Sequence, residues 1–154
     1  MATLQRMLQH WHSSKKKGRQ LFPSSALNRF HNIIAEGAPR HRALLKLAIE
    51  VALPISAILR NASSRHRACT IFKQHCICQN GDLSHLLIYI NLADKKVEIV
   101  VDNAAIQVLS VEQLDIICRR ITHGFLKGNP EEGVSAALKE LNALLEHTLP
   151  SGMA

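Results

Sequence analysis

The sequence predicts an α/β fold: a small mixed β-sheet with helices on both of its faces, followed by a C-terminal pair of helices. A hairpin pattern rich in β-branched residues occupies residues 86–102, and two amphipathic helical patterns follow it. A further apolar strand pattern, 44–51, is separated from the hairpin by helical sequence. One sheet that helices cover on both sides accommodates strands and helices in this order.

The chain is long enough for one domain with its own core. It has 154 residues, of which 47% are hydrophobic and only 4% aromatic, so the core must consist mainly of Leu, Ile, Val and Ala. We divide it into an N-terminal segment, 1–19, and an α/β domain, 20–150. The N-terminal segment is expected to combine a short helix with a basic hinge, KKKGR at 15–19.

The domain opens with a helical pattern over residues 22–37. Ser24 or Ser25 is expected to cap its first turn, because a serine side chain can accept a hydrogen bond from a free backbone N–H group. Gly37 is expected to end it.

The strand patterns differ in their apolar content. Residues 44–51 are apolar enough to predict a strand at the centre of the sheet. Residues 86–92 and 96–102 flank a three-residue polar turn and predict an antiparallel hairpin. The intervening segment, 53–75, is helical with a break near Asn61.

The two closing helices carry the strongest local signals. Ser110 and Gln113 have the spacing of a capping box, and Gly128 is expected to end the helix that they begin. Asn129 is expected to be the N-cap of the second helix, which should end near His147. A turn this short predicts two adjacent helices.

The net charge of +7 is distributed unevenly along the chain. Residues 1–75 contain thirteen Lys and Arg against two acidic residues, a net charge of +11, and the remainder has a net charge of −4. Such halves can attract an anionic partner or each other. Arg40, Arg42, Arg65 and Arg67 are the candidate anion-binding residues. They could face a protein partner or an anionic membrane surface, whereas the scarcity of aromatic residues argues against specific nucleic-acid binding.

No segment is expected to span a membrane. The longest apolar stretch contains Lys46, Glu50 and Pro54, which are costly in lipid. Arg6 and His10 stand where a signal peptide would need an apolar core. We therefore expect a cytoplasmic protein with reduced cysteines.

The loop before the hairpin raises a question of metal binding. Cys76, Cys78 and His85, with His75 nearby, could bind a soft metal such as zinc or copper. The spacing of the two cysteines is tighter than that of a zinc knuckle, and cysteine is often a small buried apolar residue, so core packing is the default interpretation. The sequence has no Gly-x-Ser-x-Gly elbow, glycine-rich phosphate loop or Cys-x₅-Arg loop.

Two motifs resemble the TPM domain family in its small proteobacterial branch. They are "LAIEVALP" at 47–54 and "LLIYINLADKKVEIVVD" at 86–102, and together with the closing helices the resemblance extends from His10 to Pro150. It implies an α/β/α sandwich. The family is associated with divalent metal binding, with acid phosphatase activity in some branches, and with maintenance of membrane proteins or complexes in others.

The residues that would bind the metal differ from the family pattern. In register, the family's loop aspartate is Gln79 here, and its loop glycine is His85. Asp102 is retained after the hairpin, but the Arg-Gly pair that follows it in the family is absent. Asp102 and Asp82 are therefore the remaining candidate ligands, and Ca²⁺ or Mg²⁺ is the cofactor that the resemblance suggests.

The leading hypothesis is a non-catalytic TPM-like binding or scaffolding domain that contacts a protein partner or an anionic surface. The alternative is a low-turnover, divalent-metal-dependent acid phosphatase in which Asp102 and Asp82 bind the metal and Arg65 or Arg67 contacts phosphate. A third hypothesis is self-association through residues 1–12.

Overall fold

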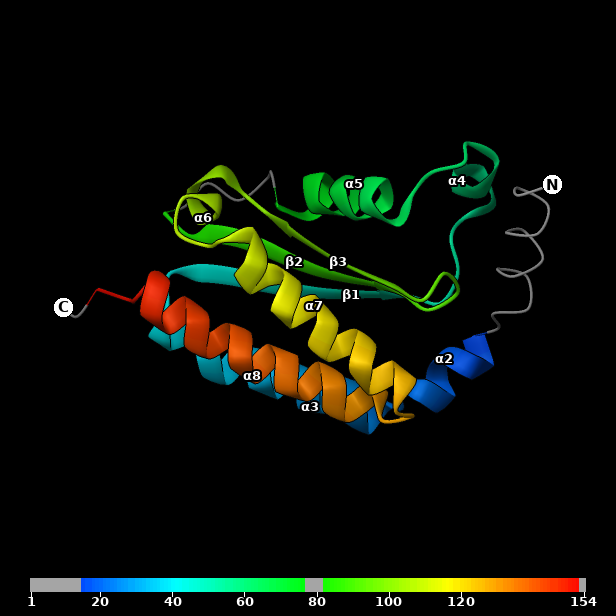
Figure 1. Cartoon of the computed structure of the whole chain (residues 1–154), viewed down its shortest axis with the longest axis horizontal. Coiled ribbons are helices and arrows are strands. Elements are labelled where there is room, and N and C mark those ends of the chain that lie inside the picture. Colours follow the sequence, from blue (N-terminus) through cyan, green and yellow to red (C-terminus); the bar gives the residue numbers. More distant parts are fainter. Residues whose placement is uncertain (1–14, 77–81, 153–154) are drawn as a thin grey trace.

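The computed structural model describes residues 15–76 and 82–152 and has three layers (Figure 1). A three-stranded sheet lies between helix α5 (Ser64–Cys76) on one face and three longer helices on the other. The prediction of a small mixed sheet with helices on both faces is confirmed.

The sheet has the order β1-β2-β3. Strand β1 (Ala43–Glu50) runs parallel to β2 (Ser84–Asn91), and β2 runs antiparallel to β3 (Lys96–Val101), which confirms the hairpin. The predicted central position of β1 is wrong, because β1 is an edge strand and β2 is central. Every residue of β2 is buried, whereas most of β1 is half-buried. Apolar content alone did not distinguish the central strand, which has two neighbouring strands, from the edge strand, which has one.

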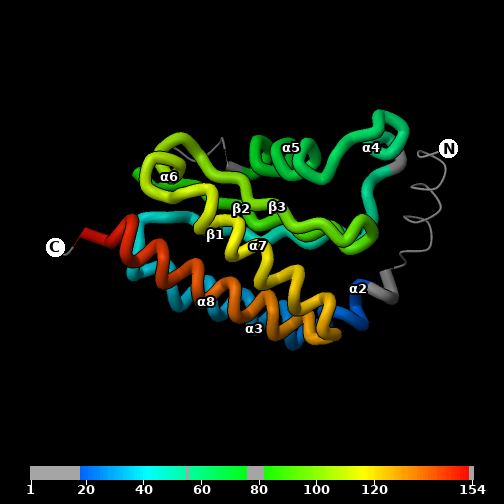
Figure 2. Tube along the Cα trace, in the orientation of Figure 1, coloured from blue at the N-terminus to red at the C-terminus, as the bar shows by residue number. Residues whose placement is uncertain are grey.

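Helices α3 (Ser24–Gly37), α7 (Val111–Leu126) and α8 (Pro130–Thr148) cover one face of the sheet (Figure 2). The larger hydrophobic core lies between them and the sheet. Its fully buried side chains include Phe30, Ile88 and Leu138. The two closing helices pack side by side, as their short connection predicts.

Helix α5 covers the opposite face, and the short α4 (Ile55–Leu59) precedes it near the end of the sheet that carries the hairpin turn (Figure 1). Between them Asn61 has a positive φ of 52°, which confirms the break predicted there. A smaller core joins α5 to the sheet; it contains Ala68, Ile71, Leu87, Tyr89 and Val100. The side chains of the sheet therefore alternate between two cores.

The helix ends agree with prediction only in part. Ser110 and Gln113 form the complete capping box, and Gly128 has a φ of 77°. Ser24 and Ser25 are not caps: Pro23 holds the N-cap position of α3 without a side-chain hydrogen bond. Proline presets the φ of the residue that enters the helix, so the helix begins there without a serine cap.

Asn129 is the N-cap of α8, but its side chain makes no capping hydrogen bond. Gly37 ends α3 with an ordinary helical φ of −78° rather than a left-handed one. A side chain there would collide with the amide of Asn142 on α8. Close helix packing therefore explains this glycine better than a C-terminal turn does.

The remaining elements are α2 (Lys15–Leu21), the short 3-10 helix η1 (Ala38–Arg40) and α6 (Asn103–Ile106). The segment expected as a hinge, 15–19, is part of helix α2. The rest of the predicted N-terminal segment lies outside the described residues. No helix among those described is long and apolar enough to cross a membrane.

Candidate functional site

Three charged or polar side chains meet at the end where the parallel strands β1 and β2 finish. Arg67 of α5 donates from Nε and Nη2 to Glu50 Oε1, at 3.1 and 2.6 Å, and from Nε to Oε2 at 3.2 Å. Tyr89 Oη donates to Glu50 Oε2 at 2.7 Å. Glu50 closes β1, so this carboxylate joins the sheet to the helix above it.

This arrangement changes the acid–base properties of both donors. Burial, and next the hydrogen bond to Glu50, raises the pKa of Tyr89, whose side chain is fully buried. The hydrogen bond to Glu50 raises the pKa of Arg67. Both donors therefore stay protonated at neutral pH, and both carboxylate oxygens accept hydrogen bonds within the fold.

A second polar group orders the hairpin turn beside this cluster. Asn91 is fully buried; its Nδ2 donates to Asp94 Oδ2 at 3.1 Å and lies 3.5 Å from Ser64 Oγ. Its Oδ1 accepts from the backbone N–H of Asp94 at 3.1 Å. The turn and the start of α5 are thus tied to the end of β2.

Asp102, a predicted metal ligand, lies at the opposite end of the sheet and caps α6. Its Oδ1 accepts from the Ala105 backbone N–H at 2.9 Å, and its Oδ2 accepts from the His85 backbone N–H at 2.7 Å. The His85 ring is nearby, with Nδ1 3.6 Å from Oδ2. Helix α6 was not predicted from the sequence, although an aspartate followed by three helix-compatible residues is a capping signal.

We expect Asp102→Ala to lower the free energy of unfolding by about 1–2 kcal/mol in protein free of divalent metal, because two backbone N–H groups lose their acceptor. The measurement is thermal unfolding in a chelator, where the loss corresponds to about 2–8 °C. Asp102→Asn is the matched control: it keeps one carbonyl acceptor and should lose less. An unchanged melting temperature in the alanine variant would contradict the capping role.

Asp82, the second predicted metal ligand, precedes β2 and has a side chain that is 96% exposed. It forms an ion pair with Arg42, at 4.0 Å. Within 15–76 and 82–152, no group of three or more His, Cys, Asp or Glu side chains could hold a metal ion. The residues described thus do not form a site that fits the divalent metal suggested by the resemblance, and the Asp102–Asp82 pair stays a prediction.

The four arginines of the predicted anion-binding set already have partners. Arg40 Nη1 lies 3.0 Å from Glu146 Oε2, and Arg42 pairs with Asp82. Arg65 Nη1 donates to the Ile99 carbonyl at 2.6 Å, with Glu98 at 3.6 Å, whereas Arg67 binds the carboxylate at the end of β1. Because Arg65 reaches β3 and Arg67 reaches β1, the two side chains of α5 diverge. Arg40 and Arg42 lie at the other end, before β1.

The cysteines show no activated thiol in the described part of the chain. Cys69 and Cys118 are half-buried free thiols. Burial, and next the charge of Glu98, raises the pKa of Cys118 to about 11, so it is protonated at neutral pH. Cys78 and the side chain of Cys76 lie outside the described residues, so the soft-metal alternative with His85 stays a prediction.

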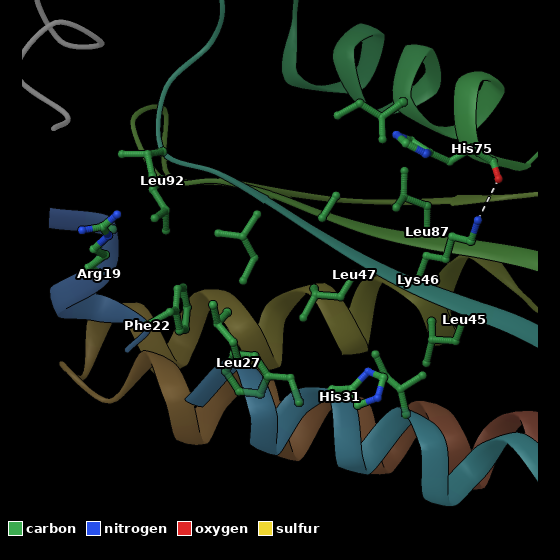
Figure 3. Close-up of a pocket in the computed structure, with 17 residues that line it drawn as sticks. Arg19, Phe22, Leu27, His31, Leu45, Lys46, Leu47, His75, Leu87 and Leu92 are labelled. Atoms are coloured by element: carbon green, nitrogen blue, oxygen red, sulfur yellow. Dashed lines mark hydrogen bonds between the residues drawn. The ribbon is translucent and has the colours of Figure 1, made fainter. Parts of the chain in front are cut away.

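A groove of about 810 Å³ follows β1, and its volume is within the size range of ligand pockets. Figure 3 shows it between α5 on one side and α2 and α3 on the other, with Leu45 and Leu47 directed toward α3. The sequence analysis missed this feature. The sequence signal for the groove is the row of apolar residues at alternate positions of β1. A strand with one neighbour leaves part of such a row uncovered.

The chain is similar to known proteins both in sequence and in fold. A family model for the TPM domain matches residues 48–144, which is well over half of the chain. The solution structure of the BA42 protein from the psychrophilic bacterium Bizionia argentinensis superposes with a TM-score of 0.71, at 19% identity over 84% of each chain. No curated protein matches the sequence. The structural similarity is evidence for the fold alone.

Proposed function

Because the chain belongs to the TPM domain family, we propose that it is a non-catalytic binding or scaffolding version of that domain, which contacts a protein partner or an anionic surface. The observation that supports this proposal is that the carboxylate oxygens of Glu50 and Asp102 already accept hydrogen bonds from the protein itself. Glu50 accepts three hydrogen bonds from Arg67 and one from Tyr89, and both oxygens of Asp102 accept backbone N–H groups. Metal-assisted hydrolysis needs several convergent carboxylates with free oxygens.

The alternative proposal is the low-turnover, divalent-metal-dependent acid phosphatase. One observation favours it: Asp82 and Asp102 both lie at the end of the sheet where β2 begins, since Asp102 binds the His85 backbone. Metal binding there would require Asp102 to exchange its backbone partners for a cation. The two proposals therefore differ in what a hard cation does to stability.

The deciding experiment is thermal unfolding of metal-stripped protein with Ca²⁺, Mg²⁺, Mn²⁺ or Zn²⁺, together with hydrolysis of p-nitrophenyl phosphate under the same conditions. For a binding domain we expect no stabilisation by a hard cation and no metal-dependent hydrolysis. Cation binding at about a hundredfold excess over Kd would stabilise by about 2.7 kcal/mol, which is a shift of several degrees.

Asp102→Asn and Asp82→Asn are the variants for this test, because asparagine preserves a capping acceptor while removing the charge that attracts a cation. Asp115→Asn, on the exposed face of α7, is the matched control. Stabilisation and hydrolysis that Asp82→Asn and Asp102→Asn abolish, but the control retains, would overturn the binding proposal and establish the phosphatase. Stabilisation by Zn²⁺ alone would direct attention to Cys76, Cys78 and His85.

A further inference from the structure

The outer edge of β1 borders the groove, and no strand of the described residues pairs with it. The Arg42 carbonyl accepts from the Ser84 N–H, and the Glu50 carbonyl accepts from the Leu92 N–H, so even-numbered residues of this segment direct their backbone groups toward β2. The backbone groups of Leu45, Leu47 and Ile49 therefore point away from the sheet. No partner for them is found among the described residues. Open strand edges readily pair with a further strand.

The floor and one wall of the groove are apolar. Phe22 and Leu27 line the side formed by α2 and α3, together with Leu45 and Leu47 from the strand itself (Figure 3). On the other side, Leu87 of β2 lies behind β1. A strand added beside β1 would place alternate side chains against this apolar wall.

The charged side chains that line the groove, among the described residues, all have the same sign. Arg19 and Lys46 are cations, His31 and His75 are titratable, and none of these described lining residues is acidic. Lys46 reaches toward α5, where its Nζ donates to the His75 carbonyl at 2.7 Å (Figure 3). Lys46 therefore makes the side of the groove opposite the apolar wall suited to an acidic side chain, whereas Arg19 belongs to α2, beside that wall.

We propose that β1 receives an extended segment of a partner protein as a fourth strand, with apolar residues toward α3 and acidic residues toward Lys46. This inference rests on the proposed binding function and names the chemistry of the partner. Main-chain hydrogen bonds to Leu45, Leu47 and Ile49 supply affinity, and the two walls select the alternating pattern.

Two other occupants fit the groove less well. Residues 1–14 contain one arginine and two histidines but no acidic residue, so they do not complement its charge. A second copy that pairs through β1 would bring another Lys46 and Arg19 against the same edge. Like charges repel each other, which disfavours both arrangements.

The experiment uses the full chain and an eight-residue peptide of alternating valine and glutamate, followed by amide hydrogen exchange and NMR shift perturbation. We expect the amides of Leu45, Leu47 and Ile49 to exchange rapidly in the free protein and about tenfold or more slowly with peptide. A valine–lysine peptide of the same length should not bind. Lys46→Glu should weaken the acidic peptide about three- to fivefold, whereas Lys139→Glu, on α8, should have no effect.

Two N-methylated peptides distinguish strand addition from a merely apolar contact. Only one edge of the peptide can face β1, so methyl groups on either the valine amides or the glutamate amides should abolish binding, and the other set should be tolerated. Equal binding by both would overturn the proposal, as would no binding at about 1 mM peptide.

The remaining outcomes identify the competing occupants. Slow exchange of these amides in the free monomer would mean that residues 1–14 already cover the edge, and protection that grows with protein concentration would mean a second copy. Either result overturns a partner strand. Each leaves the metal and hydrolysis measurements to decide the proposed function separately.

Discussion

Replacement of Gly133 by alanine is expected to lower the free energy of unfolding by about 2–3 kcal/mol, although alanine favours a helix by about 1 kcal/mol over glycine. A Cβ atom at Gly133 of α8 would lie 2.8 Å from the Gly124 Cα atom and 3.2 Å from the Arg120 carbonyl oxygen of α7. Both are backbone atoms, so relief requires the two helices to separate. Separation would loosen the core that they share with the sheet.

Urea unfolding of the variant gives the measurement, and two further variants make it specific. Gly124→Ala should be similarly destabilising, because its Cβ would lie 2.7 Å from the Gly133 Cα atom. Gly152→Ala should change little, since no atom lies within 4 Å of a Cβ there. Equal or greater stability of Gly133→Ala would show that the helices do not approach this closely.

The hairpin and the closing helices could be predicted because their determinants are local. The content of β-branched residues in β2 and β3, the capping box at Ser110 and Gln113 and the stop at Gly128 each involve residues close in the chain. Turn residues with φ > 0 and capping pairs fix such elements before any long-range contact is considered. The helical break at Asn61 follows from the same logic.

The position of β1 and the roles of its polar residues depend on contacts that are distant in sequence. Glu50 meets Tyr89 across the parallel pair and Arg67 from the covering helix, and no spacing rule predicts that meeting. The resemblance identified "LAIEVALP" as a motif but left the role of its glutamate open. Asp102, which matches the family motif, is the N-cap of a four-residue helix that was not predicted from the sequence.

Ion pairs within the fold join the basic half of the chain to the acidic half. Arg29 of α3 approaches Glu131 and Glu132 at the start of α8, at 3.5 and 3.4 Å, and Arg40 pairs with Glu146 near its end. The basic half and the acidic half therefore attract each other along the α3–α8 contact. From composition alone, the basic half could attract either an anionic partner or the acidic half of the same chain. The packing of α3 on α8 shows that the two halves do attract each other.

Glu50→Gln is expected to lower the free energy of unfolding by about 2–3 kcal/mol. The Glu50 and Arg67 side chains retain only 20% and 23% exposure, so loss of the carboxylate leaves a largely buried guanidinium without its counterion. Breaking a fully buried pair costs about 3–5 kcal/mol, and the remaining exposure of this pair reduces that value. Glutamine can still accept from Tyr89, which separates the loss of charge from the loss of shape.

Thermal and urea unfolding measure this loss, with Glu146→Gln as the matched control. That residue pairs with Arg40 at a similar distance, 3.0 Å, but both side chains are about half exposed, so its loss should cost less than about 1 kcal/mol. Arg67→Met in the Glu50→Gln background should recover part of the stability, because it removes the unpaired charge. Additive losses in that double variant would contradict a direct pair.

The pH dependence of stability tests the third member of the cluster. The pKa of Tyr89 is raised above its ordinary value of about 10, so its contribution is fully present below pH 10 and is lost as the pH rises further, where the unfolded chain releases the proton first. Tyr89→Phe should therefore remove part of the fall in stability at alkaline pH.

A contrary result for Glu50→Gln would bear on function as well. If this variant left stability unchanged at every pH, the hydrogen bonds of the carboxylate would not contribute to the stability of the fold. The carboxylate would then be available to a cation, and the argument for a non-catalytic domain would lose its main support.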